Sequence, residues 1–216
     1  MTQASDKPYR DTMDTSEDVS SKPNFSKEQL IDILCSGSSK WNAWRQLHSK
    51  EKINFNGEDL RGLDLSDCDL SEASFENANL AYSDLKNTIL IAANLSKANL
   101  CYCNLNNAKL IAANLYQASL SHANVLHANF LTAMCHRADF SNVDFRDQDL
   151  RGQNLKEANL SGADLRGQNL EGIDLRGAKL IGANLDDVNL MSANLDGANL
   201  SDVDLSSVAL DGAVRT

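Results

Sequence analysis

The sequence predicts an all-β solenoid, and two observations support this fold class. From Ile53 to Gly212 the chain repeats every five residues without an insertion or deletion, and the central residue of each unit, position i, is Leu or Phe in 30 of 32 units. Neither proline lies within the repeats, as expected where backbone N–H groups pair between strands. A period of five matches neither a continuous helix nor a plain strand. The chain must therefore turn a corner in every unit.

Each unit also specifies which residues point inward. Positions i−2 and i lie two residues apart on an extended segment and therefore face the same way. Four corners return the chain to its start after about 20 residues, with coils stacked about 4.8 Å apart. Position i−2 is Ala in 17 units, which fits a tight corner beside the larger residue at i. Position i−1 is Asp or Asn in 25 units. We expect these side chains to tolerate turn conformations and to hydrogen-bond the neighbouring backbone.

The units carry a family resemblance. Residues 93–97 (Ala-Asn-Leu-Ser-Lys) and 163–167 (Ala-Asp-Leu-Arg-Gly) resemble the A(D/N)LXX unit of pentapeptide-repeat proteins. The resemblance implies a right-handed quadrilateral β-helix with four units per coil. The repeats would then form about eight coils and a rod of roughly 38 Å.

The segment before the repeats predicts a short α-helical N-terminal cap. Ser26 to Gln29 form a capping-box pattern, and we expect a first helix to begin at Ser26 and to stop at Gly37. A second helix is expected from Ser39 to His48. Residues 41–45 also resemble a segment that precedes the repeats in many bacterial family members. The predicted organisation is a disordered tail (1–24), a helical cap (25–52), the β-helix (53–212) and a C-terminal tail (213–216). A binding role for the helical segment is the alternative to a cap.

Composition and charge limit the functional classes. A net charge of −10 argues against direct binding to nucleic acid phosphates. The first residues contain no apolar signal-peptide core, and no run of 18 apolar residues predicts a membrane span. Five cysteines without a CxxC pair indicate a reducing compartment. We therefore expect a cytoplasmic protein that contacts neither membrane nor nucleic acid directly.

No motif predicts catalysis, a cofactor or a metal. The many Asp residues recur at one structural position, which explains them without an active site. A metal site could be built from His122, His127, His136 and Cys135, which are residue types that bind zinc. Their positions in the repeat argue against it, because the histidines lie on different faces and Cys135 points into the rod. The sequence therefore predicts no catalytic residue, no metal ligand and no enzyme.

Three glutamines occupy the inward position i−2. Gln148 and Gln168 are twenty residues apart, so we expect them to stack and to hydrogen-bond each other, while Gln153 has no obvious partner. Buried amides require hydrogen-bond partners. The sequence indicates a structural role for all three.

When residues twenty apart in the sequence are aligned, two outward columns of apolar or aromatic residues appear on opposite faces. Such exposed columns are typical of a protein interface, although lateral packing of ladder side chains is the alternative explanation. The interval between Gly62 and Gly152 contains no glycine, so side chains are displayed there throughout. The predicted partner-binding residues are Ile91, Ile111 and Leu131 in one column and Tyr82, Tyr102 and His122 in the other.

The function predicted from these features is a non-catalytic protein–protein interaction scaffold with an unidentified protein partner. The alternative is a DNA mimic that binds DNA gyrase or topoisomerase, since the resemblance extends to quinolone-resistance proteins of that kind. The whole acidic surplus lies on residues 53–216, which favours the alternative. The chain lacks the loops that interrupt the coils of those proteins and a helix after the repeats, which argues against it.

The C-terminal coil suggests self-association. Nothing obvious covers its edge and end face, and an open edge favours pairing with a second copy. The resemblance also implies dimerisation through this end. We therefore expect an end-to-end homodimer through Leu195, Leu200, Leu205 and Leu210.

Overall fold

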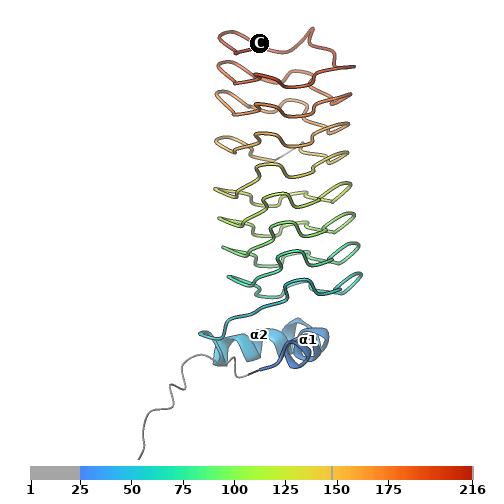
Figure 1. Cartoon of the computed structure of the whole chain (residues 1–216), viewed down its shortest axis with the longest axis vertical. Coiled ribbons are helices and arrows are strands. Elements are labelled where there is room, and N and C mark those ends of the chain that lie inside the picture. Colours follow the sequence, from blue (N-terminus) through green and yellow to red (C-terminus); the bar gives the residue numbers. More distant parts are fainter. Residues whose placement is uncertain (1–24, 147, 216) are drawn as a thin grey trace, which may run out of the picture.

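The computed structural model describes residues 25–146 and 148–215, so the predicted tail at 1–24 lies outside the described residues. Two helices are followed by a rod of stacked coils (Figure 1). The helices are α1 (Lys27–Cys35) and α2 (Ser38–Leu47), whose bounds lie within two residues of those predicted. Ser26 caps α1 with its hydroxyl, and Gln29 returns a hydrogen bond to the Ser26 backbone, as the capping box predicts. Neither helix is long and apolar enough to cross a membrane.

The helices lie against the first coils of the rod. Trp41 is fully buried, and its Nε1 donates to the Asp69 carbonyl at 2.7 Å. The amide of Asn42 accepts from the Asp69 N–H at 2.8 Å and donates to the Asp67 carbonyl at 2.9 Å. These backbone groups face the side of the coil where no earlier coil exists. The Asn42 side chain of α2 therefore takes the place of the missing ladder partner. These hydrogen bonds join the helices to the rod.

The rod is held by parallel pairing between residues twenty apart. Asn104, for example, bridges Asp84 on one side and Asn124 on the other. Each bridge involves a single residue at i−1, and the described residues contain no longer strand. The corners every five residues explain this, because they leave one residue per side in ladder geometry. Leu105 N donates to Asn124 O at 2.7 Å, and Asn124 N donates to Cys103 O at 2.9 Å. The twenty-residue coil predicted from the sequence is confirmed.

The corners are turns with a left-handed residue at i+2. Ala108 N donates to Leu105 O at 2.9 Å to close one such turn, and Asn107 between them has φ of +57°. A positive φ at the third turn position is the property of type II turns. The repeat glycines occupy this position, and among the residues that the structure describes so do twenty residues with side chains.

For Asn and Asp at position i−1, the predicted turn conformation is wrong and the predicted hydrogen bonding to the backbone is confirmed. These residues sit at the ladder bridges and not in the left-handed turn positions. Their side chains do bond the backbone: Asn114 Oδ1 accepts from Tyr116 N at 3.1 Å. Asn114 Nδ2 also donates to Asn94 Oδ1 at 3.1 Å in the preceding coil. The short amide therefore holds the turn and links coils at the same time.

The core follows the predicted inward positions. Leu and Phe at i and Ala at i−2 are buried along most of the rod, with fractional exposures close to zero. In the last coil Leu200, Leu205 and Leu210 are only partly buried. No further coil covers them among the described residues.

The coil-to-coil ladder is interrupted at several positions in the described part of the rod, since the bridges Asp149–Asn169 and Asn184–Asp204 are absent and a longer break follows the coil of residues 124–135. Within the described ranges, no bridge joins Asn124 to Asp144, Asn129 to Asp149, or Met134 to Asn154. The bridge between Asp139 and Asn159 is present, so the coils remain joined on that side. The coils in the yellow part of the rod are correspondingly less evenly stacked than those in the green part (Figure 1).

Candidate interaction surfaces

The aromatic column consists of Tyr82, Tyr102 and His122, which lie in line on successive coils. The rings of Tyr82 and Tyr102 are 5.1 Å apart with an interplanar angle of 3°, and those of Tyr102 and His122 are 4.8 Å apart at 4°. Tyr82 is 65% exposed and Tyr102 49% exposed. The ladder spacing matches the stacking distance of aromatic rings. The column is therefore a rigid, exposed stack whose ring edges face solvent.

The stack begins at Tyr82. The coil before Tyr82 has Gly62 at the equivalent position, so no side chain at i+2 stacks on that side of the Tyr82 ring. A shallow pocket of about 430 Å³ lies there, lined by Asp59, Arg61, Gly62 and Tyr82. At the other end, Asn142 Nδ2 lies 3.3 Å from His122 Nε2 and continues the column with a polar group.

The aliphatic column consists of Ile91, Ile111 and Leu131. Ala92 N donates to Ile111 O and Ala112 N donates to Leu131 O, both at 2.9 Å, which holds the three coils in line. Ile91 is 36% exposed and Leu131 is 57% exposed, while Ile111 is half-buried. The structure thus brings both predicted sets of residues together as outward columns. That either column binds a partner stays a prediction.

Sequence reasoning missed other exposed apolar residues. Met134 is 53% exposed and Leu126 is 40% exposed, and both lie near the longer break in the ladder. Met134 occupies position i−1, where Asp or Asn is the rule. That departure was the signal that could have identified it.

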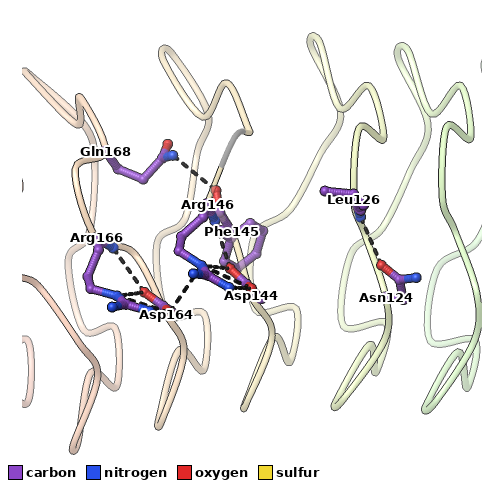
Figure 2. A network of polar contacts seen from close by, with 8 residues as sticks. All are labelled: Asn124, Leu126, Asp144, Phe145, Arg146, Asp164, Arg166 and Gln168. Carbon is purple, nitrogen blue, oxygen red and sulfur yellow. Dashed lines mark hydrogen bonds and ion pairs between the residues drawn. The ribbon is translucent and has the colours of Figure 1, made fainter.

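Five units carry an Asp at i−1 and an Arg at i+1 that form an ion pair. In Figure 2, Arg146 and Arg166 each reach back to the Asp of their own unit, with Nη2–Oδ2 distances of 2.6 Å. Arg146 Nε also lies 3.4 Å from Asp164 Oδ2 and so connects two coils. The other three pairs are Asp59 with Arg61, Asp149 with Arg151, and Asp174 with Arg176.

The guanidinium groups change the titration of these carboxylates. The hydrogen bonds from Arg151 lower the pKa of Asp149 to about 2. The pKa values of Asp144 and Asp164 are also lowered, chiefly by the hydrogen bonds from their own arginines. Part of the acidic charge of the rod is therefore neutralised locally.

The histidines and cysteines do not form a metal site. Among the described residues, no group of three or more His, Cys, Asp or Glu side chains could hold a metal ion. Cys135 is buried, and burial raises the pKa of its thiol to about 12. Burial also raises the pKa values of Cys68 and Cys103, to about 12 and about 11. These thiols serve as small core residues.

The expectation that Gln148 and Gln168 bond each other was wrong. Gln168 Nε2 donates to Phe145 O at 3.0 Å, and Gln153 Nε2 donates to Phe130 O at 2.8 Å. Each acceptor is a backbone carbonyl of the preceding coil. Gln148 Nε2 is buried without a hydrogen-bond partner.

Comparison with known proteins identifies the repeat. The family model described as pentapeptide repeats matches in eight copies, over residues 59–96, 88–130, 108–147, 133–172 and 169–206. No curated protein matched the chain.

Two solved structures illustrate the likeness. HetL, a pentapeptide-repeat protein involved in heterocyst differentiation regulation from the cyanobacterium Nostoc sp. strain PCC 7120, is 31% identical over 76% of this chain and 83% of its own, with a TM-score of 0.36. Full-length QnrB1, a plasmid-mediated fluoroquinolone resistance protein, is 18% identical over 76% of this chain and 92% of its own, with a TM-score of 0.52. At that identity, the likeness to QnrB1 concerns the fold alone. The family match and the identity to HetL together show that this chain belongs to the pentapeptide-repeat family, whose members form right-handed quadrilateral β-helices.

Proposed function

We propose that this protein is a non-catalytic protein–protein interaction scaffold, located in the cytoplasm, whose partner docks on the two outward columns. The observation that supports the proposal best is the aromatic column. Tyrosine is enriched at protein interfaces, because it offers a large contact area with few rotatable bonds. Here the rings are already stacked in the free protein, so little side-chain entropy remains to be lost on binding. The aliphatic column provides a second apolar stripe on the opposite face.

In this proposal the two helices serve as a cap at the N-terminal end of about eight coils. The hydrogen bonds of Trp41 and Asn42 to the first coils support that role, since they satisfy backbone groups at an open ladder edge. The columns are then free for binding along the sides of the rod.

The experiment is affinity capture on the immobilised protein with three variants. A triple serine variant of the aromatic column should reduce partner capture at least about tenfold, equivalent to about 1.4 kcal/mol. A triple serine variant of the aliphatic column tests the other face. The matched control replaces Asn87, Asn107 and His127, which share position i+2 but lie on an adjacent face. Circular dichroism should be unchanged in all of them. Equal capture by the aromatic variant and the control would refute the role of that column.

The acidic surplus of the repeat region supports a second candidate, a DNA mimic that binds DNA gyrase or topoisomerase. The five Asp–Arg pairs weaken it, since a mimic of phosphate groups needs unpaired negative charge. Inhibition of gyrase supercoiling that disappears at high salt would favour this candidate over the scaffold.

We also propose that the C-terminal coil mediates end-to-end association. Leu200, Leu205 and Leu210 are partly exposed, unlike the leucines at the same position within the rod. Burying this end face against a second copy would cover them. Light scattering that shows only monomers at high protein concentration would refute the proposal.

A further inference from the structure

The acidic residues of the chain leave one broad band of the rod without carboxylates. The chain contains 30 Asp and Glu residues, yet none lies between Asp84 and Asp139. The basic residues in this interval are Lys86, Lys97, Lys109 and Arg137, so residues 85–138 carry a formal charge of +4 on a chain with −10. We name residues 85–138 the belt. The acidic surplus of the rod therefore lies on the coils before and after the belt.

The fold does not require this absence of carboxylates. A side-chain oxygen at position i−1 accepts from the backbone N–H two residues later, and both Asn and Asp provide it. Asn104 Oδ1 accepts from Asn106 N inside the belt, and Asp164 Oδ1 accepts from Arg166 N outside it, both at 3.2 Å. Because either residue type builds the same turn, the uncharged choice in the belt points to a requirement at the surface. Depletion of charged residues is a property of interface cores.

One side of the belt combines apolar side chains with a lysine. Residues at i−1 and i+1 flank the inward residue at i, so both point outward from the same side of the coil. Lys109 and Ile111 hold these two positions on one coil. Parallel bridges align Lys109 with Ile89 in the coil before and with Asn129 in the coil after. The aliphatic column therefore runs beside a second row in which Lys109 lies between Ile89 and Asn129.

Lys109 has no carboxylate of its own chain to pair with. Its side chain is exposed, and in the part of the chain that the structure describes no ion pair involves it. Arg137, which also belongs to the belt, is by contrast paired with Glu157 at 2.7 Å. An unpaired lysine beside an apolar column favours a partner that brings a carboxylate, because complementary charge speeds association and improves specificity.

Acidic residues bound this surface at both ends. Asp69 bridges Ile89 from the preceding coil, and Glu72 N in that coil donates to Ile91 O at 2.9 Å. At the other end Asp149 follows Asn129 by twenty residues. A long polyanion such as duplex DNA would therefore meet carboxylates as well as Lys109. A short acidic segment of a protein can stay within the belt.

The spacing of the aliphatic column favours an α-helix as the occupant. Successive coils are about 4.8 Å apart, so the three residues of the column extend over about 10 Å along the rod. A helix that lies along the rod repeats its contact face about every 5.4 Å and falls out of step by only about 1 Å over this length. An extended strand repeats its face about every 6.7 Å and falls out of step by about 4 Å.

We propose that the aliphatic column and Lys109 bind an amphipathic α-helix of a partner protein that carries carboxylates along one edge of its apolar face. The helix lies along the rod, with apolar residues three or four apart packed on Ile91, Ile111 and Leu131. An Asp or Glu of the helix pairs with Lys109 Nζ. This inference rests on the proposed scaffold function and gives the chemical class of the partner for one of the two columns.

A designed peptide tests the proposal on the full chain by fluorescence polarisation. The probe is a fluorescein-labelled peptide of about 18 residues, with Leu residues three and four apart on one helical face and Glu along one edge of that face. It should bind the wild type with a dissociation constant below about 100 μM. A version with two prolines on the polar face should bind at least about tenfold more weakly, because proline breaks helices. Absence of binding, or equal binding of the proline version, would overturn the proposal.

Charge reversal tests the contact with Lys109. Lys109→Glu should weaken binding of the peptide at least about tenfold. The matched control is Lys179→Glu, the same change at an exposed i−1 position on the opposite side of the rod, which should leave binding within about twofold. A peptide in which Lys replaces every Glu should bind Lys109→Glu more tightly than the wild type, a gain that a loss of folding cannot produce. Equal effects of the two substitutions, or no gain with the reversed peptide, would refute the contact.

A DNA probe tests whether the belt recognises phosphate instead. A fluorescein-labelled DNA duplex should show no binding that depends on Lys109. Duplex binding to the wild type that Lys109→Glu abolishes would assign the belt to phosphate groups and overturn the proposal.

The triple serine variant of the aliphatic column separates this inference from the function on which it rests. It should lose both partner capture and binding of the designed peptide. If capture is lost while the peptide does not bind even the wild type, the scaffold function stands and the acidic helix is refuted. If capture survives while peptide binding is lost, the helix site stands and the captured partner does not use this column.

Discussion

Truncation of Leu105 tests the assignment of the repeat position i to the core. Leu105 has a fractional exposure of zero and sits in the middle of the rod, between Leu85 and Val125 in the adjacent coils. Its backbone is fixed on both sides, since Leu105 N donates to Asn124 O and Leu105 O accepts from Ala108 N. The surrounding coils therefore cannot collapse into the space that Leu105→Ala would create.

The expected loss of unfolding free energy is about 3 kcal/mol, which is the usual cost of a buried leucine in a site that does not relax. For a chain of this size, such a loss lowers the melting temperature by roughly 6–12 °C. Urea and thermal unfolding followed by circular dichroism measure both quantities.

The matched control is Leu131→Ala, the same chemical change at the neighbouring repeat position i+1. Leu131 is 57% exposed, so its truncation should cost less than about 1 kcal/mol. If the two variants lose the same stability, position i does not carry the core, and the repeat assignment on which both columns depend is incorrect.

Two further predictions concern charge and backbone conformation. Arg151 lowers the pKa of Asp149 to about 2 in the folded protein, so the pair stabilises the fold above pH about 4 and loses this effect as the pH falls toward 2. Arg151→Gln should raise the pKa of Asp149, which an NMR titration of its carboxyl carbon measures. An unchanged pKa would contradict the assigned cause. Ala112 has φ of +57°, so Ala112→Gly should relieve strain and raise the unfolding free energy by up to about 1 kcal/mol. Ala113 is buried and has no positive φ, so Ala113→Gly should lower the unfolding free energy by about 1–2 kcal/mol. If thermal unfolding shows that both glycine variants change the unfolding free energy in the same direction, this explanation is contradicted.

Much of the candidate site could be predicted because the repeat converts sequence distance into spatial distance. Residues twenty apart are neighbours in adjacent coils, so Tyr82, Tyr102 and His122 could be placed in one column by counting. Their parallel stacking followed from the fixed ladder spacing. Whether that column binds a partner depends on a second molecule, which the sequence of this chain does not describe.

Some local roles could not be predicted because they depend on which groups meet across coils. Gln168 Nε2 donates to Phe145 O and not to Gln148. Asn42 completes the ladder at Asp69 only because α2 docks there in one orientation. Neither contact has a signal in the five-residue period.

The sequence by itself determined the coil length, the inward positions and the outward columns, because each depends only on the local alternation within a five-residue unit. Only the tertiary structure decided where the ladder opens. The distance between two coils depends on the size and hydrogen bonding of side chains that meet from units twenty residues apart. Gln153 Nε2 donates to the Phe130 carbonyl of the preceding coil, and the Phe130 N–H makes no coil-to-coil bond, whereas Phe145 keeps that bond beside the equivalent amide of Gln168.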